Sequence, residues 1–183
     1  MAAGEASSVS GAGTTVAGGD PHEIGAFYMR EMPRLVLFVK TLSGSLDRHA
    51  AADVAQTAFE RALPRWTGLS QPKAWLYKVA RNEAIARCAA MRREPAADLL
   101  PERVDEVSGA LAAEWRAEQR AVIDLLQGLP PKQREVMTWT MAGFSDAEIA
   151  AALGLSTDAV KQNRHYARQK LRKRLGPRKE ESR

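Results

Sequence analysis

The chain has 183 residues, of which 45% are apolar and 27% are charged, and its net charge at pH 7 is +5. This length suits one ordinary domain or two small ones, and the basic balance favours a polyanionic partner. The single cysteine, Cys88, excludes an intrachain disulfide and a cysteine metal cluster, and the three histidines lie too far apart in sequence to suggest a metal site.

The N-terminal segment consists mostly of Ala, Gly, Ser and Thr, and Glu5 and Asp20 are the only charged residues among the first twenty. It has neither the basic start nor the apolar block of a signal peptide. No stretch of the chain approaches the ~20 consecutive apolar residues that cross a bilayer. We therefore expect residues 1–22 to form a disordered tail on a cytoplasmic protein without membrane insertion.

Three amphipathic segments follow in residues 23–92. Apolar side chains recur at helical spacing in each, as at Leu35, Phe38 and Val39 in the first. Pro33 predicts a kink or a new helix within the first segment, and Pro72 suits the first turn of the third. Three helices joined by short loops predict a compact bundle.

Residues 93–118 differ from their surroundings, because seven acidic residues outnumber three arginines and the helical periodicity weakens. Pro95 and Pro101 discourage a long helix here. Helical spacing returns near Trp115 and continues through residues 119–176, before a charged tail at 177–183. The sequence therefore predicts an all-α protein in which two small helical bundles fold separately and are joined by a flexible acidic linker.

The second block contains a helix-turn-helix pattern. Ser145 and Glu148 form a capping box that opens a short helix, Gly154 supplies a tight turn, and Ser156 is an N-cap for the next helix. Apolar Ile149 then faces the second helix across the turn. In this motif the second helix enters a major groove about 12 Å wide, and its N-terminal side chains meet base edges.

This second helix is strongly basic. From Lys161 to Lys179 it and its tail carry nine basic residues and no acidic one, a run that can neutralise phosphates. The alternative is an ordinary two-helix corner with a solvated basic face. The candidate groove residues are Ser156, Thr157, Lys161, Gln162, Arg164, His165 and Arg168.

A second candidate surface lies in the first block. Trp75, Lys78 and Asn82 are spaced i, i+3 and i+7 and share one face of the third helix. An aromatic ring beside cations and an amide suits unpaired bases, which need stacking, phosphate neutralisation and base-edge hydrogen bonds. The alternative is that Trp75 simply fills the bundle core. The whole candidate set is Arg65, Trp66, Trp75, Lys78, Arg81 and Asn82.

The two blocks together resemble extracytoplasmic-function sigma factors, the shortest type of the sigma-70 class. The resemblance in the first block rests on AFYMREMPRLVLFV, DVAQTAFERAL and PKAWLYKVARNEAI. In the second block it rests on LPPKQREVMTW, GFSDAEIAAALGLSTDAVK and ARQKLRKRL. It covers roughly residues 23–92 and 119–175, and no single motif is decisive, but the order and spacing of the blocks are specific.

The resemblance implies a division of labour. The first block (sigma region 2) would bind core RNA polymerase and the −10 element as a melted strand, capturing a flipped base in a pocket made by the 64–71 loop and Asn82. The second (sigma region 4) would read the −35 element as duplex, and the acidic linker would thread the polymerase cleft. An anti-sigma factor is a further expected partner. Docking on a coiled coil of the polymerase would involve Asp53, Gln56, Thr57 and Phe59.

Two residues depart from the family pattern. An apolar residue usually stands where this chain has Arg164, and Gly often stands where it has Asp158. Arg164 either faces the groove in an altered register or weakens the packing of its helix, and Asp158 suits the helix dipole but repels phosphate.

Two alternative functions explain the sequence less well. A helix-turn-helix regulator that never binds polymerase would leave the first block unexplained. An enzyme has little support, since the sequence offers no phosphate loop, metal set, cofactor motif or nucleophile grouping.

Overall fold

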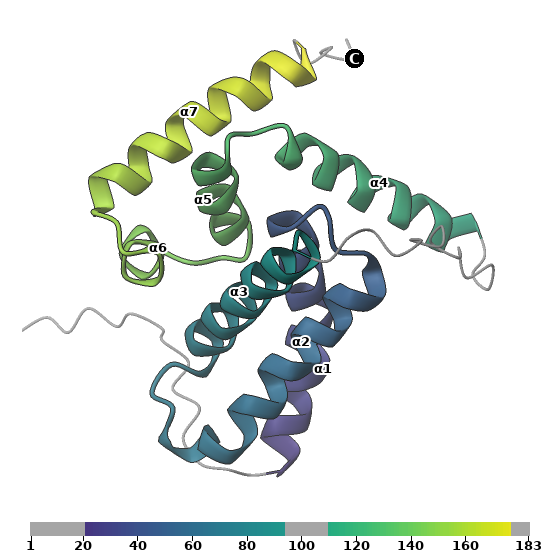
Figure 1. Ribbon diagram of the computed structural model, residues 1–183, viewed down its shortest axis with the longest axis vertical. Helices are drawn as coiled ribbons and strands as arrows, with labels where there is room; N and C mark the ends of the chain where they lie inside the picture. The colour runs from purple at the N-terminus through teal and green to yellow at the C-terminus, as the bar shows by residue number, and fades with distance from the viewer. Residues whose placement is uncertain (1–20, 94–109, 177–183) are drawn as a thin grey trace, which may run out of the picture.

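The computed structural model describes residues 21–93 and 110–176, and all regular structure in these ranges is helical (Figure 1). Residues 1–20 of the tail predicted over 1–22, most of the predicted linker and the tail at 177–183 lie outside them, whereas residues 21 and 22 begin the first helix. The first block consists of α1 (Pro21–Leu42), α2 (Arg48–Ala62), the 3-10 helix η1 (Leu63–Gly68) and α3 (Pro72–Met91). The second consists of α4 (Ala110–Gln127), α5 (Pro131–Met141), α6 (Asp146–Leu153) and α7 (Thr157–Leu175). Within the described ranges, no helix is long and apolar enough to cross a membrane.

Small side chains let the helices of the first block pack closely. Ala58 of α2 and Ala80 of α3 are fully buried beside larger residues such as Leu35 and Leu76. The Asp47 carboxylate caps α2 by accepting a 2.6 Å hydrogen bond from the backbone N–H of Ala50. The predicted three-helix bundle is therefore confirmed.

Helix α1 continues through Pro33 as one element, so no new helix begins there. Proline removes the hydrogen bond to the carbonyl four residues earlier, which belongs to Met29. Met29 is 74% exposed, so Pro33 interrupts the hydrogen bonding on the outer side of α1. The buried side of α1 continues past Pro33 from Phe27 to Val39 and includes the Glu31 carboxylate.

Helix α4 begins at Ala110, earlier than the sequence predicted. The linker predicted over residues 93–118 is therefore helical from 110 onwards. Residues 110–118 read ALAAEWRAE, which is rich in strong helix formers, and both linker prolines lie upstream of this stretch. Helix propensity thus overrides the acidic composition from which the linker was predicted.

The two blocks pack against each other through aromatic side chains of α1, α3 and the α5 region. Trp139 of α5 is fully buried and lies 5.3 Å, centroid to centroid, from Phe38 of α1. Phe144, which follows α5, lies 5.1 Å from Tyr77 of α3. Each such aromatic pair contributes about 0.5–1.5 kcal/mol beyond its burial. Helical periodicity places an apolar residue on a face but does not say which helix will cover it, so this docking was not predicted.

The turn between α6 and α7 depends on a glycine with a positive φ angle, which substitution can test. Gly154 has φ +65°, whereas Gly25 lies within α1, and an added Cβ meets nothing within 4 Å at either position. Gly154→Ala should lower the free energy of unfolding by about 1–2 kcal/mol through backbone strain. Gly25→Ala should raise it by up to ~1 kcal/mol. Urea unfolding followed by circular dichroism measures both, and effects of the same sign would contradict the assignment.

Candidate nucleic-acid interface

Helices α6 and α7 form the predicted helix-turn-helix. Ile149 of α6 and Val160 of α7 are fully buried, and the backbone N–H of Leu155 donates to the Ala150 carbonyl at 3.0 Å across the turn. The Ser156 hydroxyl accepts from the N–H of Ala159 at 3.1 Å and so starts α7. The two helices are thus held at a fixed angle, with one side of α7 left open.

The capping box before α6 is also confirmed. The Glu148 backbone N–H donates to the Ser145 hydroxyl at 3.3 Å, and the Ser145 N–H donates to the Glu148 carboxylate at 2.8 Å. The hydrogen bond from the Ser145 side chain, followed by that from its backbone, lowers the pKa of Glu148. Glu148 is therefore charged at neutral pH, beside the positive end of the α6 dipole.

Six of the seven candidate groove residues are exposed. Because Val160 and Ala167 point inward, residues near 162 and 165 lie on the opposite side of α7. Tyr166, which the sequence reasoning missed, is 45% exposed beside them, and its hydroxyl accepts from the Gln162 amide at 3.5 Å. Tyr166 follows Gln162 by four residues, and this spacing places the two side chains on the same side of a helix, so the sequence alone could have indicated it. The exposed candidates are Ser156, Thr157, Lys161, Gln162, His165 and Arg168.

Arg164 is the exception, because its side chain points toward α6 rather than into solvent. Its guanidinium forms a bidentate ion pair with the Asp146 carboxylate at the start of α6. Nη1 donates to Oδ1, and Nη2 donates to Oδ2 at 2.9 Å. Both side chains are less than a quarter exposed. Arg164 lies four residues after Val160 and therefore on the inner side of α7. The ion pair occupies the place where the resemblance led us to expect an apolar contact.

Asp158 remains at the exposed end of α7. Its carboxylate lies 3.9 Å from the Lys161 ammonium, and 93% of its side chain is exposed. Such a weak exposed pair leaves Lys161 available to a phosphate. Asp158 therefore stays a local negative charge beside the candidate groove residues.

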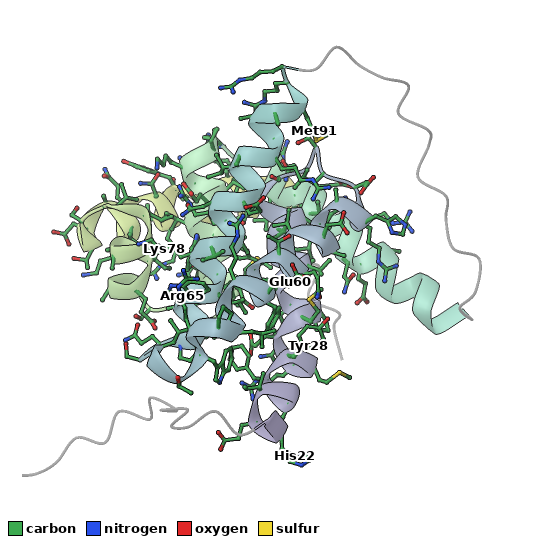
Figure 2. All side chains as sticks on the ribbon, turned by 60° about the horizontal axis from the view of Figure 1, so that its bottom comes forward. His22, Tyr28, Glu60, Arg65, Lys78 and Met91 are labelled. Atoms are coloured by element: carbon green, nitrogen blue, oxygen red, sulfur yellow. The ribbon has the colours of Figure 1, made fainter. Side chains whose placement is uncertain are left out.

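The face of α3 predicted to bind unpaired bases is only partly available. Lys78 and Arg65 are exposed (Figure 2), as is Asn82. Trp75 is half-buried and packs against the core, so the core alternative accounts for part of its ring. Trp66 is 4% exposed and lies 4.9 Å from the Phe27 ring. In this structure Trp66 is therefore part of the core of the first block.

Arg81 connects this face to the second block. Its Nε donates to the Glu135 carboxylate of α5 at 2.5 Å, and the two side chains are 19% and 10% exposed. Its Nη1 also donates to the Asn82 amide oxygen at 3.1 Å. A guanidinium that was expected to meet phosphate is thus held by a carboxylate of the same chain.

The residues expected to dock on a polymerase separate into two groups. Asp53 and Gln56 are exposed on α2 and Thr57 is half-buried. Phe59 is 2% exposed and its ring lies 4.7 Å from that of Tyr28, so in this structure it supports the core. Phe59 belongs to the buried side of α2 with Ala55, Ala58 and Ala62, whereas Asp53, Gln56 and Thr57 are spaced i, i+3 and i+4 and share another side.

Metal ligands are not gathered among the described residues. In residues 21–93 and 110–176, no three His, Cys, Asp or Glu side chains gather as a metal site. The buried carboxylate of Glu31 instead accepts from the Tyr77 hydroxyl at 3.1 Å and pairs with Arg30 at 3.0 Å. Burial, with the help of the Glu31 charge, raises the pKa of Tyr77, so the phenol stays protonated and keeps this bond.

Comparison with known proteins matches both blocks. The model of sigma-70 region 2 matches residues 27–94, and that of sigma-70 region 4 matches residues 119–171. The ECF RNA polymerase sigma factor SigD of Mycobacterium tuberculosis is 35% identical over 151 residues, covering 76% of this chain and 71% of that protein. The RNA polymerase sigma-E factor of Streptomyces coelicolor is 31% identical over 162 residues, covering 80% and 89%.

Two solved structures share the fold. CnrH, in complex with the cytosolic domain of CnrY, has a TM-score of 0.60 and 25% identity, covering 86% of this chain and 90% of that one. The sigma factor RpoE from Bartonella quintana, in complex with the anti-sigma factor NepR, has a TM-score of 0.61 and 22% identity, covering 84% and 96%.

The ion pair inside the helix-turn-helix gives a prediction about stability. Asp146→Ala leaves the Arg164 charge half-buried and unpaired, so it should lower the free energy of unfolding by about 1–3 kcal/mol. Adding Arg164→Leu should restore most of this loss, because an apolar contact replaces the pair. The control is Asp53→Ala, which breaks an exposed pair with Arg87 and should cost less than ~1 kcal/mol. Urea unfolding that shows no recovery in the double variant would contradict a paired Arg164.

Proposed function

The chain belongs to the sigma-70 family as an extracytoplasmic-function sigma factor, and we propose that two of its surfaces read the two promoter elements. It is an alternative RNA polymerase sigma factor that directs promoter recognition and transcription initiation. The finer proposal concerns which residues do this. The observation that carries it is the exposed basic side of α7, which stands free of the rest of the fold.

Helix α7 reads the −35 element as duplex. Thr157, Lys161 and Gln162 lie in its first turns, where a recognition helix meets base edges. His165 and Arg168 follow on exposed positions. The basic residues neutralise phosphates and fix the register, whereas the Gln162 amide is suited to an adenine edge. Arg164 acts indirectly, because its ion pair with α6 sets the position of α7.

The exposed face of α3 captures the −10 element as a melted strand. The Asn82 amide offers base-edge hydrogen bonds, Lys78 and Arg65 offer charge, and the exposed part of Trp75 offers a stacking surface. The loop of residues 64–71 borders this face and would help to hold a flipped base. Unstacking a base costs a few kcal/mol, which stacking and base contacts can return.

The exposed side of α2, with Asp53, Gln56 and Thr57, docks on the polymerase core. The polymerase then supplies the chemistry, so the chain itself is not an enzyme, and it acts in the cytoplasm of a bacterium. The acidic segment between the blocks passes through the polymerase cleft. Because CnrH and RpoE were solved with CnrY and an anti-sigma factor, we include an anti-sigma factor among the partners of this chain. A regulator that ignores polymerase would leave the match of the first block unexplained.

The −35 assignment is tested with Gln162→Ala. In complex with core polymerase, this variant should lose about 1–3 kcal/mol of discrimination at one base pair of the −35 element and little elsewhere. Competition binding against promoters with single substitutions measures the loss position by position. Lys132→Ala is the control, because it removes an exposed polar side chain from α5, outside the α7 surface. Unchanged discrimination at every position would exclude Gln162 from the groove.

The −10 assignment is tested with Asn82→Ala. The variant should keep duplex −35 binding but lose about ten- to a hundredfold in open-complex stability, the cost of one base contact. Permanganate footprinting of unpaired thymines on linear templates measures the opening. A template with a pre-melted bubble should recover part of the loss, since Asn82 also contacts the strand. Wild-type opening by the folded variant would show that this face is structural, and Glu83→Gln on the same helix is the control.

A further inference from the structure

We propose that the cavity between α1, α3 and α5 binds a small organic acid, a molecule with one carboxylate and an apolar body. The apolar body lies inside the cavity, and the carboxylate lies against Lys73 and Arg34. This ligand site goes beyond the proposed function, because it involves neither promoter DNA nor polymerase. Its test therefore succeeds or fails independently of the promoter assignments.

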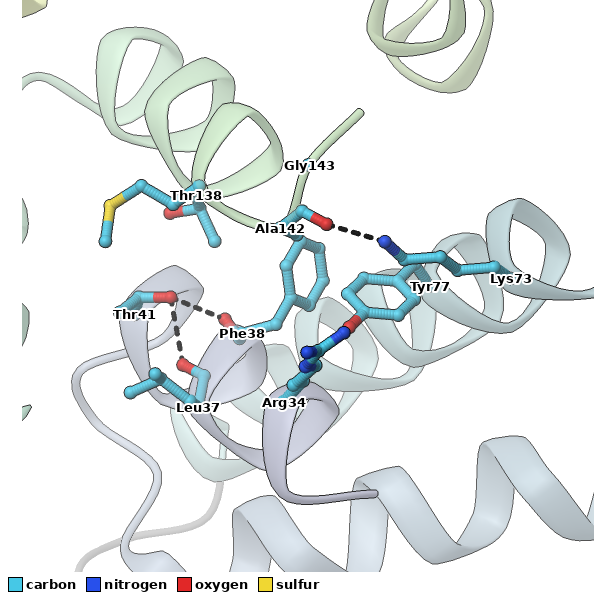
Figure 3. A pocket seen from close by; sticks show the side chains of 10 residues that line it. Arg34, Leu37, Phe38, Thr41, Lys73, Tyr77, Thr138, Ala142 and Gly143 are labelled. Atoms are coloured by element: carbon cyan, nitrogen blue, oxygen red, sulfur yellow. Dashed lines mark hydrogen bonds between the residues drawn. The ribbon is translucent and has the colours of Figure 1, made fainter. Parts of the chain in front are cut away.

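The cavity has the size and the lining of a ligand site. Its volume is about 430 Å³, which falls within the ~300–1,000 Å³ range of small-molecule pockets. Phe38 and Tyr77 form its buried side, where they are 3% and 0% exposed, whereas Met141 is 52% exposed at its edge (Figure 3). Packed cores leave few gaps larger than a water molecule. Buried rings on one side and an exposed methionine on the other therefore leave a space that a ligand can enter from solvent.

Lys73 brings a positive charge to the lining of this cavity. Its side chain is half-buried, and its ammonium donates to the Ala142 carbonyl at 2.8 Å (Figure 3). The same ammonium lies 4.8 Å from the centre of the Phe144 ring and 5.6 Å from that of Tyr77. None of the ion pairs among the described residues includes Lys73. A half-buried ammonium without a counter-ion is unfavourable, and a carboxylate bound beside it offsets this cost.

The carboxylate of Glu148 is affected by Lys73 but does not pair with it. Hydrogen bonds from the Ser145 side chain and then from its backbone are the main causes that lower the pKa of Glu148, and the charge of Lys73 is a smaller one. The Glu148 carboxylate accepts from the Ser145 hydroxyl at 2.6 Å and from the Ser145 N–H at 2.8 Å. It is therefore engaged at the start of α6, and Lys73 keeps donors for a ligand.

Arg34 supplies a second cation to the lining. Its side chain is 63% exposed, and its contact with the Glu31 carboxylate is long, at 3.6 Å. Glu31 is engaged more closely by Arg30 at 3.0 Å and by the Tyr77 hydroxyl at 3.1 Å. Arg34 therefore also keeps N–H donors for a ligand, and the residues that line the cavity include no carboxylate. Two cations without an acidic residue favour an anionic ligand over a cationic one.

The apolar walls decide which kind of anion fits. Leu37, Phe38 and Met141 line the cavity and offer no charge to a ligand. Inorganic phosphate is strongly hydrated and gains nothing from such walls, so entering the cavity would cost it more than the two cations return. An acid with an apolar body instead removes its own apolar surface and that of the walls from water, while its single charge stays beside Lys73 and Arg34. The lining therefore favours an organic acid over a bare anion.

Titration of the full-length chain with 4-phenylbutyrate tests the site, because this acid joins one carboxylate to one aromatic ring. Its Kd should be about 0.1–1 mM, the affinity expected for a ligand of about twelve non-hydrogen atoms. The neutral amide of the same acid should bind about tenfold more weakly, because a hydrogen bond between charged groups is lost. Inorganic phosphate should also bind more weakly than the acid. Equal affinity for the acid and its amide, or tighter binding of phosphate, would overturn the proposal.

Nuclear magnetic resonance of the methionine methyl groups follows this titration and locates the ligand. The Met141 methyl resonance should shift and saturate as the acid is added, since Met141 lines the cavity. The Met29 resonance should stay in place, because Met29 is 74% exposed on α1 and is not part of the lining. An acid that shifts Met29 as much as Met141 binds exposed apolar surface in general, and this result would overturn the proposal.

Charge variants test the two cations. Lys73→Met should weaken binding of the acid about tenfold and leave binding of the amide unchanged. Arg34→Gln should act in the same direction by a smaller factor, because solvent screens an exposed charge. The control is Lys132→Met, which removes an exposed charge of α5 outside the cavity and should leave the affinity unchanged. Circular dichroism shows whether each variant is folded, and Arg34→Gln provides the test if Lys73→Met is not. Unchanged affinity for the acid in the folded charge variants would contradict the site.

Discussion

The burial of Trp139 between the two blocks is the interaction on which the rest of the structure depends. The core that belongs to the second block alone is small, formed by Leu126, Leu129, Met137 and Ala167. Trp139, the largest of the fully buried side chains, instead belongs to a core that both blocks share. The second block therefore takes its orientation from α1 and α3, and this orientation decides which functional surfaces face solvent.

The two nucleic-acid surfaces differ in how they are supported. The α7 surface is held from within its own block, by a glycine turn, two capping serines and the ion pair of Arg164 with Asp146. The α3 surface has a rigid helix beneath it but shares Arg81 with the second block. One surface is therefore complete in the free chain, and the other depends on where the second block lies.

Much of this arrangement follows from local sequence rules. The capping box at Ser145, the turn at Gly154 and the exposed side of α7 were predicted because each depends on residues within a few positions of one another. Local rules do not settle the surroundings of every candidate side chain. Phe59 lies on the buried side of α2, and Trp66 packs on the ring of Phe27, 39 residues earlier, so both face the core.

The remaining differences have identifiable physical causes. Arg164 occupies an inner position of α7 because Asp146, eighteen residues earlier, supplies its charge partner. The docking of the blocks brings Glu135 to Arg81 across 54 residues of sequence, a pairing that no local pattern contains. The one available signal was that Arg164 stands where the resemblance to the family leads one to expect an apolar residue.

Run-off transcription with purified core polymerase on fragments of genomic DNA tests the central claim most directly. Adding this chain should yield new transcripts with discrete starts downstream of one shared pair of sequence elements. Transcripts identical to those made by core polymerase alone, from a chain that still binds DNA, would contradict it.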